Sequence, residues 1–320
     1  MKADVMLQIQ SDPGTYAIFR TLSQKEQEAF LGFCMGERGL KITYDPFFKH
    51  IFHPGAHPGR LDRLLSCILG QTVTVRKMLP TERRPISENG SLIILDILVE
   101  LTDGRLVNVE MQRIGYDFPI ERSFCYGADL LVRQYDVHRE EQGKHFSYRS
   151  INPVIVIVLM EESPSLFHSF PTKYIHRSRF SFDTGLKMTS LQNFIYISLD
   201  IFRQTSHNKL VEPGVPMAEL EAWMYFLSSD EPADILRIIT EYPYFQHLYQ
   251  DIVNFRFNPK ELISMYSEAL RILDENTVKY MIDELKEALS KKDSELSRKD
   301  SEIEELRSRL AKYEQTEQVE

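Results

Sequence analysis

The sequence predicts an α/β protein followed by a helical region and a tail helix. Strand-like runs such as "TVTVRKML" and "VIVIVLM" alternate with helical periodicity, everything from about residue 217 reads as helix, and a seven-residue repeat occupies the tail. The expected parts are an N-terminal helical segment over 1–42, an α/β domain over 43–205, a helical region over 206–280 and a tail over 281–320.

Local signals place the first helices. Ser23 precedes Glu26 by three residues, which is the spacing of a capping box, within an expected helix over 14–40. Asp45 and Pro46 suit the N-cap and first helical position of a short helix that carries Phe48, Lys49 and Phe52. The elements expected next are, in order, a helix over 61–70, a strand over 72–79, two strands joined at "LTDGRL", a helix over 118–139, a strand over 153–160, and β-like stretches over 169–182 and 193–202.

Composition restricts the classes of protein. No run approaches the roughly 18 to 20 apolar residues of a membrane helix, and the start "MKADVMLQIQSD" lacks the apolar stretch of a signal peptide. The three cysteines are scattered without metal-type spacing, so we expect a cytoplasmic protein with no membrane partner. The net charge of −9 argues against binding nucleic acid by bulk electrostatics, although local basic patches occur at Arg83–Arg84 and over 173–179.

The tail contains an internal repeat, "KKDSELS" followed by "RKDSEIE". An apolar row at seven-residue steps runs through Ile282, Leu289, Leu296, Ile303 and Leu310. A second row is interrupted by Lys292 and Lys299, so both a coiled-coil helix that pairs two chains and a single solvated helix stay open.

Two loop lengths compete at the Asp-Gly turn. With a two-residue loop, Asp96 lies opposite Met111, whereas a three-residue loop with Gly104 in the left-handed position pairs Asp96 with Glu110. The three-residue loop sorts the side chains better, because one face then collects only apolar residues along both strands. We therefore expect Asp96 and Glu110 to be opposed, with Gln112 on the same side.

Two opposed carboxylates need compensation. Their Cβ atoms lie about 4.5 to 5.5 Å apart, so either one carboxyl is protonated or a divalent cation lies between them. The alternative is a solvent-exposed face on which Asp96 and Glu110 are each hydrated, although Ile94, Leu98 and Leu106 on that face indicate partial cover by a helix.

The pattern of Asp96 followed across a hairpin by Glu110 and Gln112 resembles the PD-(D/E)XK nuclease superfamily, in a variant with Gln in the last place. Longer segments resemble the Rpn-type recombination-promoting nucleases, also called transposases, over about 43–285. These segments are "DPFFKHIF", "LLSCILG", "ILDILVELTDGRLVNVEMQ", "ERSFCYGADLLVRQY", "PVIVIVLM" and "WMYFL". The resemblance implies a restriction-endonuclease-like core within 43–205, in which helices flank a mixed central sheet.

The same resemblance implies a metal-dependent DNA endonuclease with Asp96, Glu110 and Gln112 as catalytic residues. Asp96, Glu110 and the main-chain carbonyl of Met111 would bind Mg²⁺, with Mn²⁺ as a substitute. Gln112 stands where Lys is common, and Leu95 replaces the usual Pro before Asp96. An amide can orient water or a phosphate oxygen, but it carries no charge and relays no proton.

Three further residues match family positions after or before the motif. Arg122 and Tyr126 lie one helical turn apart, and Lys49 could supply the missing positive charge. An ordinary surface ion pair for Arg122 and an exposed Lys49 stay open as alternatives. Asp62 and the pair His53 and His57 are weaker metal candidates, since the histidines lie in a Gly/Pro-rich loop.

The leading expectation is therefore a cytoplasmic, Mg²⁺-dependent DNA endonuclease, with the tail helix as a route to a homodimer. The alternative is a catalytically inactive relative that binds DNA or a protein partner, which the amide at Gln112 and the acidic balance keep open.

Overall fold

The computed structural model describes residues 2–43, 45–81, 96–114, 120–208 and 217–265, together with 292, 297–299, 301 and 303. The chain divides into two units, Met1–Ala269 and Leu270–Glu320, and the fold described below is that of the first. Several expectations fall outside the described residues: the Arg83–Arg84 patch, the strand start at 91–95, the helix start at 118–119, and most of the tail's apolar rows. The domain boundaries expected from the sequence stay predictions.

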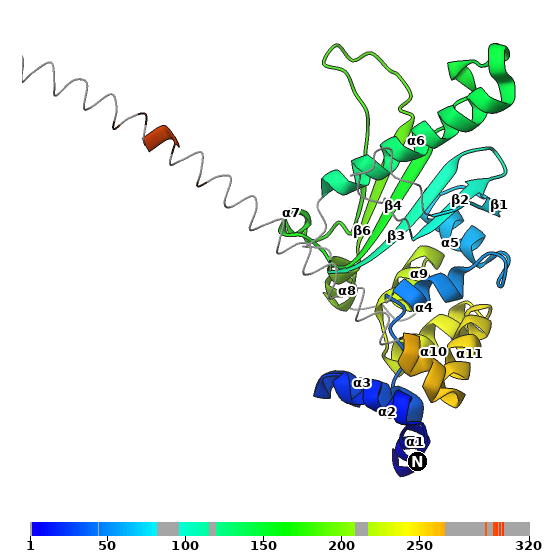
Figure 1. Cartoon of the computed structure of the whole chain (residues 1–320), viewed down its shortest axis with the longest axis vertical. Helices are drawn as coiled ribbons and strands as arrows, with labels where there is room; N and C mark the ends of the chain where they lie inside the picture. Colours follow the sequence, from blue (N-terminus) through cyan, green and yellow to red (C-terminus); the bar gives the residue numbers. More distant parts are fainter. Residues whose placement is uncertain are drawn as a thin grey trace, which may run out of the picture. The chain divides into compact units, whose positions relative to one another are not determined.

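Six strands form one mixed sheet, in the order β1-β2-β3-β4-β6-β5 (Figure 1). They are β1 Val75–Met78, β2 Ile97–Leu101, β3 Leu106–Ile114, β4 Val154–Glu162, β5 Ile175–Arg177 and β6 Gln192–Ser198. β3, β4 and β6 run parallel, and the other neighbours pair antiparallel. The run at 154–161 is buried throughout because β4 is a central strand with both faces covered.

Helices surround this sheet and continue beyond it. They are α1 Lys2–Gln10, α2 Pro13–Thr21, α3 Gln24–Met35, α4 Asp45–Phe52, α5 Arg60–Leu69, α6 Ile120–Gln142, α7 Ser165–His168, α8 Leu199–Asn208, α9 Glu219–Ser228, α10 Pro232–Glu241 and α11 Phe245–Asn254. Short 3-10 turns lie at η2 Gly143–His145, η3 Tyr148–Ser150 and η4 Phe255–Phe257. None of the described helices is long and apolar enough to cross a bilayer.

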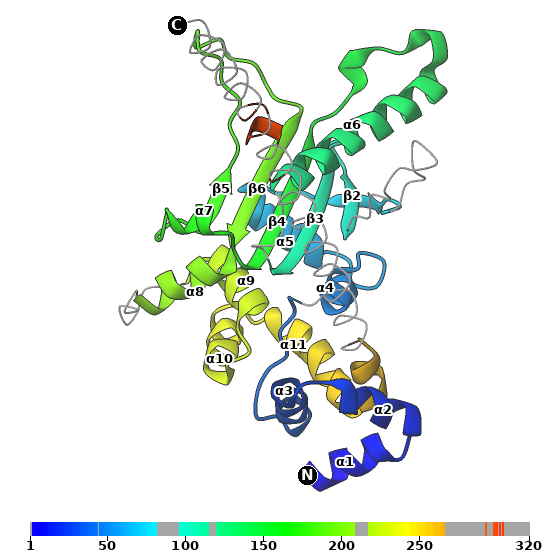
Figure 2. The same ribbon diagram turned by 60° about the vertical axis from the view of Figure 1, so that its left-hand side comes forward.

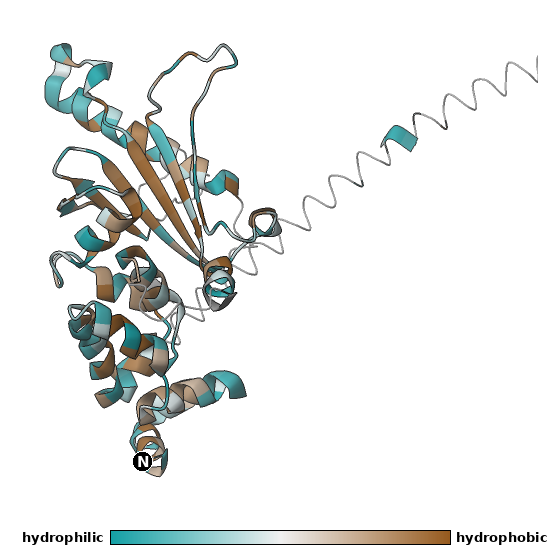
Figure 3. Ribbon diagram, turned by 180° about the vertical axis from the view of Figure 1, so that it is seen from behind, coloured by the Kyte–Doolittle hydropathy of each residue, from teal (hydrophilic) through white to brown (hydrophobic). Residues whose placement is uncertain are grey.

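The long helix α6 covers one face of the sheet (Figures 1 and 2). Tyr126 and Leu130 on its inner side pack with Leu98 of β2 and Val158 of β4 in one core cluster. A Cβ atom on Gly127 would come within 3.3 Å of the Phe194 ring, so glycine lets the helix approach β6 closely. The strands are hydrophobic and the outer helix surfaces largely hydrophilic, as Figure 3 shows. The cover by α6 means that the face carrying Leu98 and Glu110 is not open to solvent.

An aromatic core joins α4 to the helical region. Trp223 is fully buried, and its ring lies 5.8 Å from that of Phe52 and 4.6 Å from that of Phe245. Phe47 and Phe48 are also fully buried, so three aromatic anchors fix α4. The aromatic residues near the single tryptophan therefore form core, and through them α4 is held beside the sheet.

Two expected elements differ from the structure. The helix expected over 14–40 is two helices, and the break at Leu22 lets Ser23 cap α3 through a capping box with Glu26. The β-like stretch over 193–202 ends as a strand at Ser198, and α8 begins at Leu199. An apolar run with buried residues on one side suits a strand or a helix equally, and Asp200 in the first turn favours the helix because of the positive end of its dipole. The stretch over 169–182 contains only the short strand β5.

Candidate functional site

The β2–β3 hairpin has the three-residue loop that the sequence favours. The Leu101 N–H donates to the Arg105 carbonyl at 2.9 Å, and Gly104 has φ of 84°. Ile97 faces Val109 and Leu98 faces Asn108, which is the register expected for the longer loop. One step further along the same register, Asp96 comes beside Glu110.

Backbone hydrogen bonds hold the two acids together. The Asp96 N–H donates to Glu110 Oε1 at 3.2 Å, and the Met111 N–H donates to Asp96 Oδ2 at 2.9 Å. Since Leu101 and Arg105 form a hydrogen-bonded pair, the N–H and C=O of alternate β3 residues up to Met111 point toward β2. The carbonyl of Met111 therefore points toward β2, on the side where Asp96 lies.

Glu110 is a buried carboxyl, with 1% of its surface exposed. Its pKa lies well above the ordinary value because burial disfavours the charged form and the neighbouring Asp96 carboxylate repels a second negative charge. The Asn108 side chain, Arg122 and the Asp96 N–H act in the opposite direction without reversing the shift. Burial and the Asp96 charge thus disfavour the ionised form of Glu110, and a cation beside it would favour that form.

Asn108 is a site residue that the sequence reasoning did not single out. Its Nδ2 donates to Glu110 Oε1 at 2.8 Å, and the side chain is fully buried. Within the described part of the chain, its Oδ1 has no hydrogen-bond partner. The signal was present in the sequence, because a residue two positions before Glu110 on a strand must share its face.

Lys49 reaches the acid pair from α4. Its Nζ lies 3.4 Å from Asp96 Oδ1, with the two side chains 37% and 16% exposed. The buried aromatic residues on either side of Lys49 fix the helix, so the lysine is presented by a rigid element. A positive charge from a different part of the sequence is thereby placed at the acid pair.

Arg122 and Tyr126 lie over the same face, on the first turns of α6. The guanidinium carbon of Arg122 is 5.3 Å from the Tyr126 ring, and its charge acts on Glu110. Burial, followed by the Glu110 charge, raises the pKa of Tyr126. Gln112 follows Glu110 on β3, is partly exposed, and pairs in register with Met160 of β4. The structure therefore brings Asp96, Glu110, Lys49, Arg122 and Tyr126 together.

Other candidates have structural partners instead. Asp62 Oδ1 accepts the Val75 N–H at 2.9 Å and so joins α5 to β1. His57 Nδ1 lies 3.8 Å from Asp251, while His53 accepts the Gly55 N–H within its own loop. Among the described residues, no group of three or more His, Cys, Asp or Glu side chains is arranged to hold a metal ion.

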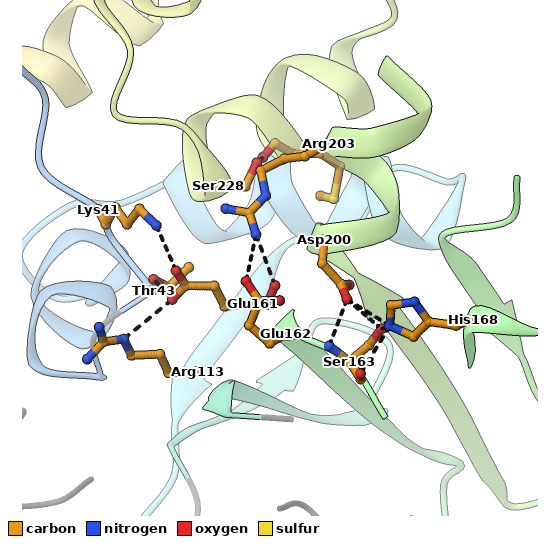
Figure 4. Close-up of polar contacts among 11 residues, drawn as sticks. Lys41, Thr43, Arg113, Glu161, Glu162, Ser163, His168, Asp200, Arg203 and Ser228 are labelled. Carbon is orange, nitrogen blue, oxygen red and sulfur yellow. Dashed lines mark hydrogen bonds and ion pairs between the residues drawn. The ribbon is translucent and has the colours of Figure 1, made fainter. Parts of the chain in front are cut away.

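A second polar cluster lies at the ends of β4 and β6 (Figure 4). The buried Glu161 carboxylate accepts from Lys41 Nζ at 3.0 Å and from the Thr43 hydroxyl at 2.6 Å, and Arg113 lies 3.7 Å away. Burial alone would raise the pKa of Glu161, but Lys41, Thr43 and Arg113 outweigh it and hold the pKa below its ordinary value. The cluster attaches the segment before α4 to the sheet.

Ser163, His168 and Asp200 in the same figure resemble a catalytic triad in composition only. His168 Nε2 lies 3.3 Å from Ser163 Oγ and 3.1 Å from Asp200 Oδ2. A triad needs the acid on one ring nitrogen and the serine on the other, and here both share Nε2. Asp200 also accepts the Ser163 N–H at 3.0 Å, so the group connects β4 to α8.

Comparison with protein families decides the relationship. Residues 43–284 match the family described as PD-(D/E)XK nuclease family transposase. The chain belongs to this family. Neither the curated proteins nor the solved structures yield a match to it.

Membership of the transposase family agrees with the mixed six-stranded sheet and its flanking helices. It supports a nuclease- or transposase-like function, for which DNA is the implied substrate. Members of the superfamily typically use divalent metals. The acid pair, formed by Asp96 just before β2 and Glu110 on β3, lies within the matched residues.

Proposed function

We propose that this transposase-family protein is a metal-dependent DNA endonuclease whose site is formed by Asp96, Glu110 and Gln112. The observation that carries the proposal is the direct apposition of Asp96 and Glu110. The Asp96 N–H donates a hydrogen bond to Glu110 Oε1 at 3.2 Å. Fold stability gives no reason to bury one acid against another, since the pair raises the pKa of Glu110. A function for the pair explains its presence.

The donor set fits a hard divalent cation. Asp96, Glu110 and the Met111 carbonyl offer three oxygen ligands beside the start of β2. Mg²⁺, with Mn²⁺ as a substitute, prefers such ligands together with water and phosphate oxygens. When bound, the ion polarises the scissile phosphate and activates a water molecule for attack. The Asn108 Oδ1 atom, which has no hydrogen-bond partner in the described part of the chain, adds a polar atom beside Glu110, while Asn108 Nδ2 orients the carboxylate.

The remaining residues act on the phosphate and the water. Lys49 provides the charge that Gln112 lacks, because its ammonium lies 3.4 Å from Asp96 and can turn to a phosphate oxygen. Gln112 orients the attacking water by hydrogen bonds without changing its protonation. Arg122, exposed above Tyr126, is placed to bind a phosphate and to stabilise the ionised Glu110.

Metal dependence tests the proposal directly. Purified protein is expected to nick supercoiled plasmid with Mg²⁺ or Mn²⁺ and to lose this activity in EDTA, since Asp96 and Glu110 alone supply no cation. Agarose-gel conversion of supercoiled to relaxed DNA measures it. Cutting that persists in EDTA would remove the metal from the proposal.

Replacing Lys49 separates its role from that of an exposed lysine. Lys49→Met is expected to lower the nicking rate about 10- to 100-fold, roughly 1.4 to 2.7 kcal/mol of barrier, with Lys49→Arg retaining part of it. Lys25→Met on α3, another exposed lysine, is the matched control and should leave the rate unchanged. A Lys49→Met protein as fast as wild type would make the contact with Asp96 merely structural.

A second candidate function is a catalytically inactive relative that binds DNA or a protein. The amide of Gln112, where an amine is common, favours it. Metal-independent DNA binding without nicking at any metal concentration would select this alternative. A cytoplasmic location and a homodimer formed through the tail over 281–320, for which the sequence predicts a helix, are further parts of the proposal.

A further inference from the structure

The loop over 178–191, which joins β5 to β6, projects beyond the sheet (Figures 1 and 3). Residues 183–189 are all exposed. Four large apolar side chains in the loop face solvent, namely Phe180 at 52%, Leu186 at 60%, Met188 at 57% and Leu191 at 41% exposure. Apolar side chains on a projecting loop do not pack in the core, and a group of them indicates a contact with another molecule.

The loop nevertheless has a defined shape. Gly185, with φ of 75°, donates its N–H to the Phe182 carbonyl at 3.0 Å. The rings of Phe180 and Phe182 pack edge to face at 4.9 Å. The loop borders an open hollow of about 380 Å³, lined by residues between Phe180 and Thr189. A preformed loop loses less entropy on binding than a flexible one.

The charge of the loop is opposite to that of the whole chain. Arg179 and Lys187 are both exposed, and Asp183 is the one acid between 178 and 191, whereas the chain carries −9. Arg177, directly before the loop, donates to the Ile68 carbonyl and so fixes the base of the loop against α5. Basic residues interleaved with large apolar ones suit a polyanion that also offers apolar surface, which is the chemistry of a nucleic-acid groove.

Sheet register places the loop within reach of DNA bound at the acid pair. Gln192 at its end aligns through Val154 of β4 with Leu106 of β3, four residues before Glu110. Two strand spacings across the sheet and four residues along β3 place Gln192, at the base of the loop, about 16 Å from Glu110, and the loop extends from Gln192 away from Glu110. One turn of B-DNA spans about 34 Å, so one duplex can contact both places.

We propose that the loop over 178–191 is a DNA-contacting wedge, separate from the catalytic site. Arg179 and Lys187 bind backbone phosphates, and Phe180, Leu186 and Met188 enter a groove and pack against sugars and base edges. The inference rests on the proposed function only in taking DNA as the ligand. The wedge holds the duplex whether or not it is cut.

The test is binding of a fluorescein-labelled 30-base-pair duplex in EDTA, measured by anisotropy over a salt series. Arg179→Glu with Lys187→Glu is expected to weaken binding at least about 10-fold and to lower the slope of log K against log salt by about 2. Phe180→Ser with Leu186→Ser and Met188→Ser should weaken binding about 10-fold with the slope unchanged. Arg20→Glu with Lys25→Glu, two exposed basic residues of α2 and α3, matches the charge change and should have a smaller effect.

The outcomes distinguish failure of the proposed DNA contact of the loop from failure of the proposed nuclease activity. Loss of binding in both loop variants, with Asp62→Asn binding as wild type does, supports the wedge even if no protein nicks DNA. Nicking and binding by loop variants at wild-type levels overturn the wedge and leave the nuclease intact. A change of sedimentation mass without a change in DNA affinity overturns it in favour of self-association, and a wild-type protein that binds no DNA in EDTA overturns the wedge, while nicking with Mg²⁺ still tests the nuclease.

Discussion

Replacing Glu110 with glutamine is expected to lower Mg²⁺-dependent nicking by at least about 10³-fold, roughly 4 kcal/mol of barrier. The glutamine Oε1 can still accept from Asn108 Nδ2 and from the Asp96 N–H, which lie 2.8 and 3.2 Å from Glu110 Oε1. The change therefore removes the negative charge and leaves the local geometry in place. Because a divalent cation between two carboxylates loses half of its ligand charge, both its affinity and its effect on the phosphate should fall. Initial rates of plasmid nicking over a Mg²⁺ series measure the change.

Asp62→Asn is the control for this experiment. Asp62 is also an acid near the sheet, but its carboxylate accepts the Val75 N–H at 2.9 Å, a bond that an asparagine oxygen can keep. Its nicking rate should stay within about 2-fold of wild type if only the acid pair binds metal. Equal losses in Asp62→Asn and Glu110→Gln would mean that the rate reports folding, and an active Glu110→Gln protein would contradict the site.

The hairpin register was predictable because two independent signals agree there. Asp-Gly turn chemistry limits the loop to a few lengths, and the alternation of apolar and polar residues chooses among them, since a slip of one residue would place Val107 and Val109 on the same face as Asp96. These constraints are local in sequence. The apposition of Asp96 and Glu110 follows from them without knowledge of the tertiary structure.

Features that depend on packing between distant segments were less accessible. Resemblance alone suggested Lys49, and its distance to Asp96 is set by the aromatic contacts of α4, such as that of Phe52 with Trp223. The start of α8 at Leu199 was missed because apolar runs do not distinguish helix from strand and because Asp200 finds its partner, Ser163, in the distant segment that follows β4. The polar partners of Glu161 likewise come from segments more than 40 residues away.

The same Glu110→Gln variant is expected to be more stable than wild type in EDTA at neutral pH, by about 1 to 3 kcal/mol. Burial and the Asp96 charge raise the pKa of Glu110 in the folded protein. Above the ordinary value of 4.5, the unfolded chain releases the Glu110 proton while the folded protein holds it, so wild-type stability falls as pH rises toward the folded pKa. Glutamine does not titrate, and the advantage of the variant should therefore grow as pH rises above the ordinary value of 4.5 toward the folded pKa of Glu110. Urea unfolding of both proteins at each pH measures the difference in free energy of unfolding.

Glu161 provides a control of opposite sign in the same sheet. Lys41, Thr43 and Arg113 outweigh burial and hold its pKa below the ordinary value, so the ionised carboxylate stabilises the fold above the unfolded pKa, and this contribution is lost as pH falls through the folded pKa. Glu161→Gln should thus be less stable than wild type at pH 7, with the difference shrinking toward acid. Two buried glutamates of one sheet then respond oppositely because one lies beside an acid and the other beside bases.

Addition of Mg²⁺ should stabilise wild type and Glu161→Gln but not Glu110→Gln, since only the intact acid pair binds the ion in the folded state. A Glu110→Gln protein less stable than wild type in EDTA would show that Lys49 and Arg122 already compensate the charge, and the acid pair would then need no metal.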